Sequence, residues 1–127
     1  MATTVLIVDD SKLARIVVGK AVTAAKPDWE RLEAGNAEEA LAAIAAQKPD
    51  VAIFDFNMPG MNGIELAERV RGEHPDMPIA IATANVQDEI IARARAAGAV
   101  FVPKPITEDS LRGFLSGAAL QLKARGG

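Results

Sequence analysis

The sequence predicts an α/β fold in which helices cover both faces of a five-stranded parallel sheet. Short apolar runs rich in β-branched residues alternate five times with longer segments of helical periodicity. Strict strand–helix alternation is typical of parallel sheets, because each crossover helix packs on one face or the other. No repeat, low-complexity segment or linker interrupts the pattern. Residues 1–127 are therefore expected to form one domain.

The first strand is expected at Val5–Val8, where a β-branched run ends at two aspartates. Asp10 or Ser11 can cap the helix that follows over Lys12–Ala25, because both side chains accept hydrogen bonds from free helix N–H groups. Four apolar side chains share one face of this helix at helical spacing: Leu13, Ile16, Val17 and Ala21.

A weaker strand is expected at Arg31–Ala34. Together with Arg31, the charged residues Glu30 and Glu33 make this segment too polar for the centre of a sheet, so it is expected at an edge. The helix after it is expected over Ala37–Gln47, where alanine and glutamate give strong helical propensity.

An otherwise apolar run forms the third expected strand, at Val51–Phe56, and carries a carboxylate, Asp55, near its end. A carboxylate placed against a core is costly unless something compensates it. Turn-forming residues break the strand at once, and two of them, Gly60 and Gly63, are expected in turns that need a positive φ. The next helix is expected over Ile64–His74.

Two further strand–helix pairs complete the pattern. Strand-like residues at Ile79–Thr83 precede a helix over Gln87–Ala97, and Gly98 follows where glycine commonly ends a helix. A short strand at Val100–Val102 precedes the last helix, over Glu108–Lys123. Few topologies remain, because crossovers between parallel strands are right-handed.

The composition excludes several classes of protein. The chain has no cysteine, so neither a disulfide scaffold nor a thiolate metal site is possible. No apolar run approaches the roughly 20 residues of a membrane span, and no signal-peptide pattern is visible, so a cytoplasmic protein is expected. A net charge of −3 and an aromatic content of 4% disfavour binding to nucleic acid. Four arginines are expected on solvated helix faces: Arg69, Arg71, Arg93 and Arg95.

Polar side chains follow four of the expected strands. In a parallel sheet all of them lie at the same edge, outside the carboxyl ends of the strands. They are Asp9, Asp10, Asp55, Asn57, Thr83 (followed by Ala84 and Asn85) and Lys104. Two carboxylates about 4 Å apart repel by roughly 4 kcal/mol at an effective dielectric constant near 20, so protons or a cation must relieve the cluster. Hard oxygen ligands without histidine or cysteine suit Mg²⁺.

The same residues suit phosphoryl transfer. A carboxylate can act as the nucleophile and form an acyl phosphate. Lys104 adds a fixed positive charge and Thr83 adds a hydroxyl donor. Catalysis would then consist of positioning and charge neutralisation by the metal ion and the lysine.

In order along the chain, Asp9-Asp10, Asp55 with Asn57-Met-Pro-Gly-Met-Asn-Gly63, Thr83-Ala84 and Lys104-Pro105 resemble the receiver domain of bacterial two-component response regulators. The resemblance extends over essentially the whole chain. The free-standing type of the chemotaxis regulators is the most similar. This resemblance implies a flavodoxin-like strand order, 2-1-3-4-5.

Carried over residue by residue, the resemblance implies that Asp55 is the phosphoacceptor. Asp10 and Asp55 would bind Mg²⁺ through their carboxylates, and Asn57 through its main-chain carbonyl. Asp9 would act mostly through water. The resemblance also implies a partner that donates the phosphoryl group, either a sensor histidine kinase or a histidine phosphotransfer protein.

The resemblance further implies a switch. Lys104 would pair with the phosphoryl oxygens, Thr83 would move to bond the phosphate, and Phe101 would turn inward with it. A downstream protein would then read the face formed by residues 87–106 and the final helix. The chain would assist its own phosphorylation and dephosphorylation without being an enzyme for a separate substrate, and neither nucleic acid nor a membrane is expected as a partner.

Three alternatives remain open at this point. A phosphorelay intermediate would pass its phosphate to another histidine. A magnesium-dependent phosphatase with an aspartate nucleophile typically has a second aspartate two residues later, where this chain has Asn57. A flavin-binding module needs a phosphate loop rich in serine, threonine and glycine, and Asp9-Asp10-Ser11-Lys12 has the wrong charge for one. The kinase, the target, the pathway, the phosphate lifetime and the oligomeric state stay open.

Overall fold

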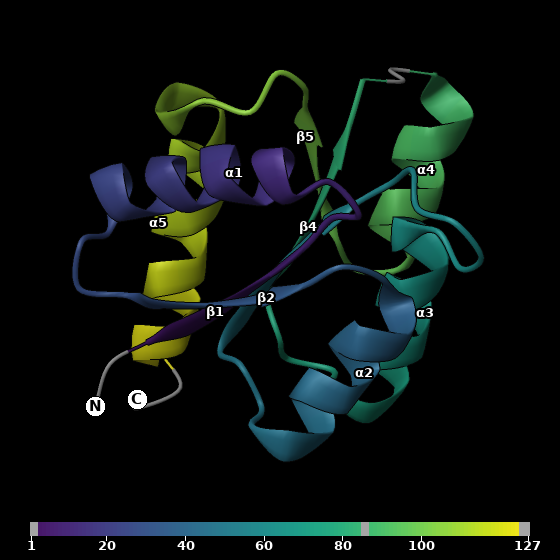
Figure 1. Ribbon diagram of the computed structural model, residues 1–127, viewed down its shortest axis with the longest axis horizontal. Helices are drawn as coiled ribbons and strands as arrows, with labels where there is room; N and C mark the ends of the chain where they lie inside the picture. Colours follow the sequence, from purple (N-terminus) through teal and green to yellow (C-terminus); the bar gives the residue numbers. More distant parts are fainter. Residues whose placement is uncertain (1–2, 85–86, 125–127) are drawn as a thin grey trace.

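The computed structural model describes residues 3–84 and 87–124, in which five strands alternate with five helices (Figure 1). The strands are β1 Thr4–Val8, β2 Glu30–Ala34, β3 Val51–Asp55, β4 Ile79–Thr83 and β5 Val100–Pro103. The helices are α1 Lys12–Ala25, α2 Ala37–Ala46, α3 Gly63–Glu73, α4 Asp88–Ala96 and α5 Glu108–Ala124. Each element expected from the sequence is present, with boundaries that differ by one residue at most.

All neighbouring strands are parallel, in the order β2-β1-β3-β4-β5. The expected fold class and strand order are thus confirmed. The chain leaves β1 toward one edge of the sheet and continues from β3 toward the other, so the order reverses between these two strands. Open α/β sheets bind ligands outside the carboxyl ends of the strands at such a point.

The helices form two layers around the sheet. In Figure 1, α1 and α5 cover one face, while α2, α3 and α4 cover the other. Side chains of β3 alternate between the two cores: Ile53 packs with α1 and α5, and Phe54 packs with α2 and α3. Asp55 stands two residues after Ile53 and therefore belongs to the α1 face.

Within residues 3–84 and 87–124, none of the helices combines the length and the apolar character that crossing a bilayer would require.

The polar strand β2 lies at an edge of the sheet, as its charges predicted. Of the four residues on the apolar face that the sequence of α1 predicted, only Ala21 is buried, and it packs in the core with Val18 and Val22. Leu13 is 71% exposed, and Ile16 and Val17 are 41% and 44% exposed. Apolar residues occupy more than one side of this helix, and periodicity alone does not say which side meets the sheet.

Helix α3 starts at a well-defined cap immediately after the β3–α3 loop. The Asn62 side chain accepts a hydrogen bond from the Glu65 N–H, and the Glu65 carboxylate accepts one from the Asn62 N–H, each at 2.9 Å. This reciprocal capping box satisfies two N–H groups that the helix leaves free. It fixes where the chain leaves the loop that follows Asp55.

Glycine is required at different positions of this fold for different reasons. Gly60 has the expected positive φ, 79°. Gly63 does not, so the prediction of a positive φ there was wrong. A Cβ at Gly63 would instead overlap the main-chain carbonyl oxygen of Asp55, so the position requires glycine for space. Gly98 ends α4 with a φ of 71°, as predicted.

Arg71 does not lie on a solvated helix face, contrary to prediction. Its guanidinium donates to the carbonyl oxygens of His74 and Pro75, at 3.1 and 2.8 Å, and of Ala97 and Gly98, at 3.1 and 2.9 Å. These acceptors end α3 and α4, where helices leave carbonyl groups free. Arg71 therefore ties the C-terminal ends of the two helices together.

Candidate functional site

The carboxyl ends of β1 and β3 bring three carboxylates together. Asp9 and Asp55 are buried, with 5% and 4% of their surface exposed, while Asp10 is exposed. Each offers an oxygen atom, and the three atoms lie within 4.8 Å of one another. The predicted convergence of these residues is present in the structure.

The loop after β1 holds Asp9 by both its main chain and its side chain. Its N–H donates to the Ala34 carbonyl at 3.1 Å, and its Oδ1 accepts from the Ser11 N–H at 2.9 Å. The Ser11 hydroxyl accepts in turn from the Ala14 N–H at 3.2 Å, so Ser11 is the cap of α1. Asp10, the other candidate cap, is left free to present its carboxylate to the site.

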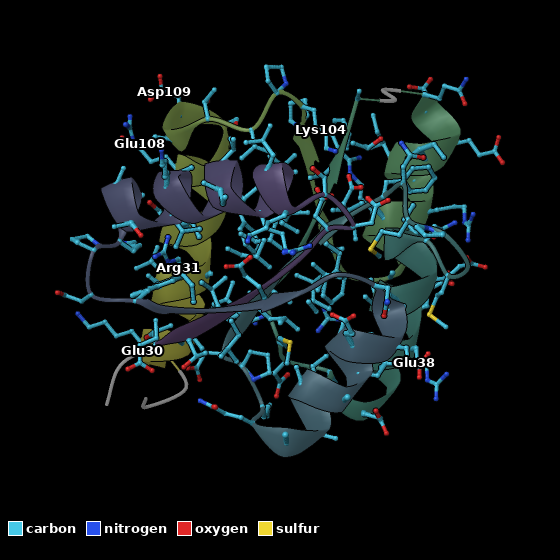
Figure 2. All side chains as sticks on the ribbon, viewed as in Figure 1. Glu30, Arg31, Glu38, Lys104, Glu108 and Asp109 are labelled. Carbon is cyan, nitrogen blue, oxygen red and sulfur yellow. The ribbon has the colours of Figure 1, made fainter. Side chains whose placement is uncertain are left out.

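Lys104 brings a positive charge to the cluster from the end of β5 (Figure 2). Its Nζ lies 2.6 Å from Asp55 Oδ1 and 4.0 Å from Asp9 Oδ2. Its N–H donates to the Thr83 carbonyl at 3.0 Å, which holds the lysine beside the end of β4. One ammonium group faces three carboxylates, so the site keeps an excess of negative charge.

Asp55 Oδ1 is fully buried, and its 2.6 Å contact with the Lys104 ammonium is a charge-assisted pair. In the part of the chain that the structure describes, no donor other than Lys104 is recorded for this oxygen. A buried charged oxygen is costly unless such partners compensate it. Mg²⁺ fits the donor set, because carboxylate oxygens from Asp10 and Asp55 stand together with no nitrogen or sulfur ligand among them.

Burial raises the pKa of Asp55 above its ordinary value of 3.8, and Lys104 opposes the shift only in part. Burial also raises the pKa of Asp9, against the opposing hydrogen bond from the Ser11 N–H. The Asp10 carboxylate adds to both shifts, and that of Asp55 adds to the shift of Asp9. Without a cation, the site therefore holds protons more tightly than solvated carboxylates do.

The other predicted site residues lie around this cluster. Thr83 ends β4 and is fully buried. Asn57 is exposed in the loop after β3, where it lines a pocket together with Asp10. Ala84 is exposed, whereas Asn85 lies outside the described residues.

Phe101 is half-buried in β5 and pairs in register with Ile81, as Thr83 pairs with Pro103. Paired residues of neighbouring strands point to the same face, and alternate residues of one strand do so too. Thr83 and Phe101 therefore share the face of Ile81, which packs in the core of α2, α3 and α4.

A cavity of about 290 Å³ opens beside the cluster, between α1 and the loop after β5. Its walls are mostly apolar and include Leu13, Val17 and Ile106. Asp55 and Lys104 line it as well. A side chain that enters this cavity beside α1 can therefore reach the buried carboxylate of Asp55 between mostly apolar walls.

One residue at this edge was missed from the sequence. Arg15 of α1 donates to the main-chain carbonyl of Asp9 at 2.6 Å and pairs with Glu33 of β2 at 2.9 Å. The available signal was a basic residue one helical turn after an acidic loop. Spacing along one helix cannot show that a side chain folds back onto that loop.

Comparison with known proteins identifies the family. The chain matches the response regulator receiver domain over residues 5–116. It is 37% identical over 106 residues to the DNA-binding transcriptional regulator NtrC of Salmonella typhimurium, covering 83% of this chain and 22% of that protein. It is 33% identical over 105 residues to the probable transcriptional regulatory protein TcrX of Mycobacterium tuberculosis, covering 82% and 44%. The chain thus spans less than half the length of these relatives.

Solved structures of receiver domains have the same fold as this chain. The chemotaxis protein CheY4 of Vibrio cholerae superposes with a TM-score of 0.83 at 31% identity, covering 93% of this chain and 99% of that one. A CheY-like receiver domain protein of Methanospirillum hungatei superposes with a TM-score of 0.87 at 27% identity, covering 98% and 99%. Receiver domains are signalling switches of two-component systems and are generally not enzymes. The resemblance expected from the strand ends is confirmed: the chain belongs to the response regulator receiver domain family.

Proposed function

We propose that this protein is a phosphorylation-activated switch in which Asp55 accepts a phosphoryl group from a phosphohistidine. The buried Asp55 carboxylate supports this most directly, because it pairs with Lys104 at 2.6 Å and stands in a cluster of three carboxylates that could hold a metal ion. An oxygen of the Asp55 carboxylate attacks phosphorus as the P–N bond breaks. The electron pair leaves with the imidazole nitrogen, and the product is an acyl phosphate.

Each neighbour of Asp55 has a part in this step. The Asp10 and Asp55 carboxylates and the Asn57 main-chain carbonyl would hold Mg²⁺, with Asp9 acting through water. When bound, the metal ion would neutralise charge on the phosphoryl oxygens. The Lys104 ammonium stands 2.6 Å from the Asp55 carboxylate. It can pair with the carboxylate before transfer and with the phosphoryl oxygens afterwards.

The surface beside the site suits a protein donor. Leu13, Ile16 and Val17 leave an exposed apolar strip on α1, and Leu13 and Val17 also line the cavity that reaches Asp55. A histidine on the surface of a partner helix can enter this cavity while apolar residues of that helix cover the strip. We therefore propose a histidine kinase or a histidine phosphotransfer protein as the donor.

We propose α4 as the element that carries the signal outward. Ala94 is its one fully buried residue. Arg71 holds the opposite end of the helix. If Thr83 moves toward the phosphate, Phe101 can fill the space it leaves, and α4 can pivot about its held end.

The surface read by a downstream protein would then lie on residues 87–106 and α5. Ile91, Arg93, Arg95 and Phe101 give it a mixed apolar and basic character. Ile106, the last residue of this range, is instead buried and lines the cavity beside α1. The phosphate drives such a change only through different free energies of interaction with the two states.

The test measures transfer of labelled phosphate from each purified histidine kinase of the source organism, with Mg²⁺ and with EDTA. One kinase is expected to label the wild type in the presence of Mg²⁺. No labelling is expected for the wild type in EDTA, nor for Asp55→Asn in either condition. Transfer onward to a second histidine would favour the relay. Turnover of a phosphate ester would favour the phosphatase. Labelling that survives Asp55→Asn would contradict the proposal.

A further inference from the structure

We propose that Arg15 is a positioning residue for the metal ligand Asp10, a role that rests on the proposed magnesium site. The guanidinium bridges two elements: Nη1 donates to the main-chain carbonyl of Asp9 at 2.6 Å, and Nε donates to Glu33 Oε1 at 2.9 Å. Its side chain is only 17% exposed, whereas that of Glu33 is 51% exposed. The arginine therefore lies beneath the loop that carries the acidic pair.

The bonded carbonyl belongs to the peptide unit that joins Asp9 to Asp10. A peptide unit is planar, so fixing its oxygen also fixes the direction of the Asp10 N–H and Cα. The preceding peptide is fixed as well, because the Asp9 N–H donates to the Ala34 carbonyl. Arg15 thus sets the backbone from which the Asp10 side chain projects.

Asp10 needs this help more than its neighbours do. Asp9 is buried and accepts a hydrogen bond from Ser11, and Asp55 is buried at the end of β3. Asp10 is exposed, and the approach of its carboxylate to the other two depends on the loop backbone. Ligand groups held in place before binding lose less freedom when the ion arrives.

The effect of Arg15 on Mg²⁺ affinity separates positioning from simple charge. If Arg15 acted only as a nearby positive charge, removing it would reduce the repulsion of the cation and tighten Mg²⁺ binding. If it positions Asp10, removing it weakens Mg²⁺ binding despite the lost repulsion. The two roles therefore predict changes of opposite sign.

The experiment titrates Mg²⁺ into ¹⁵N-labelled protein and follows the amide signals of Asp10, Ser11 and Phe56. Arg15→Met removes the donors but keeps an apolar stem. Glu33→Gln breaks the ion pair and leaves the bond to Asp9, and Lys20→Met removes one positive charge from the same helix. We expect Arg15→Met to raise the Kd for Mg²⁺ roughly tenfold, as loss of a supporting ligand contact commonly does. Both controls are expected to stay within about twofold of wild type, because neither loses the bond to Asp9.

A second variant covers the case in which Arg15→Met fails to fold. Arg15→Lys keeps the charge but lacks the planar fork that serves both acceptors, so a severalfold weaker affinity is expected. Unchanged or tighter Mg²⁺ binding in the folded variants, with a normal response in wild type, would overturn the role of Arg15 alone. A wild type that shows no Mg²⁺ response would overturn both this role and the proposed function.

Discussion

Gly63, the first residue of α3, lies against the main-chain carbonyl of Asp55 so closely that no side chain fits between them. Its own N–H donates to the Phe56 carbonyl at 3.1 Å. The start of α3 is thus packed directly on the backbone of the proposed phosphoacceptor. A larger residue at position 63 would therefore displace the backbone of Asp55.

Gly63→Ala is therefore expected to be destabilising by about 1–3 kcal/mol, because the new methyl group must push the Asp55 backbone away. Gly72→Ala is the matched control on the same helix, since a Cβ there meets nothing within 4 Å. That substitution is expected to stabilise the protein by about 0.5–1 kcal/mol. Urea denaturation of both variants measures the difference, and equal effects would contradict the packing described for Gly63.

The metal-free protein is expected to lose stability as pH rises, in part through Asp55. The pKa of Asp55 is raised in the folded state, so the folded chain binds this proton more tightly than the unfolded chain. The free energy of unfolding then falls as pH rises from the ordinary pKa through the raised one. Asp55→Asn lacks this loss, so its stability relative to wild type should be greater near pH 7 than near pH 4.

Denaturation in EDTA at several pH values gives this relative stability directly. A difference between the two proteins that does not grow with pH would contradict the raised pKa. Mg²⁺ at about 100 times its Kd should stabilise the wild type by about 2.7 kcal/mol at neutral pH. The same addition should stabilise Asp55→Asn much less, because one ligand is lost.

Arg71→Met is expected to cost about 1–3 kcal/mol of folding free energy, because four carbonyl groups at the ends of α3 and α4 lose a charged donor. Hydrogen exchange should rise selectively at the C-terminal end of α4. Arg69→Met, which removes an exposed arginine from the same helix, should change stability by less than about 0.5 kcal/mol. If both variants behaved alike, Arg71 would not tie the two helices together.

Leu13→Ala is expected to slow phosphotransfer from a histidine-phosphorylated partner roughly tenfold, as truncation at the centre of an interface commonly does. The rate with acetyl phosphate should stay unchanged, because a small donor does not cover α1. Leu120→Ala is the control, since Leu120 is 69% exposed on α5 and Leu13 is 71% exposed. Equal slowing by the two variants, or slowing with acetyl phosphate, would argue against docking on α1.

The sequence predicted those features that depend on neighbours along the chain. Apolar runs that end in Asp10 and Asp55 marked two strand ends, and parallel pairing then brought their carboxylates together. The polar strand β2 was placed at the edge correctly, because too few of its side chains can be buried.

Features that depend on contacts between distant elements were not predictable in the same way. The sequence around Arg71 does not show that α4 ends beside it, so its bond to the Gly98 carbonyl could not be predicted. Gly63 lies in a turn-like sequence, but the position requires glycine because the Asp55 backbone approaches it too closely for a side chain. The exposed side of α1 was misread because several of its faces are apolar.

Asp55 is expected to be the single phosphorylation site of the protein, with Mg²⁺ bound beside it. The intact mass of the protein after incubation with acetyl phosphate and Mg²⁺, measured for wild type and for Asp55→Ala, tests this assignment. The wild type is expected to gain the mass of one phosphoryl group, localised to Asp55 by fragmentation, and to gain nothing in EDTA. Asp55→Ala is expected to gain nothing under either condition. A wild type that stays unmodified, or full phosphorylation of Asp55→Ala, would contradict the account.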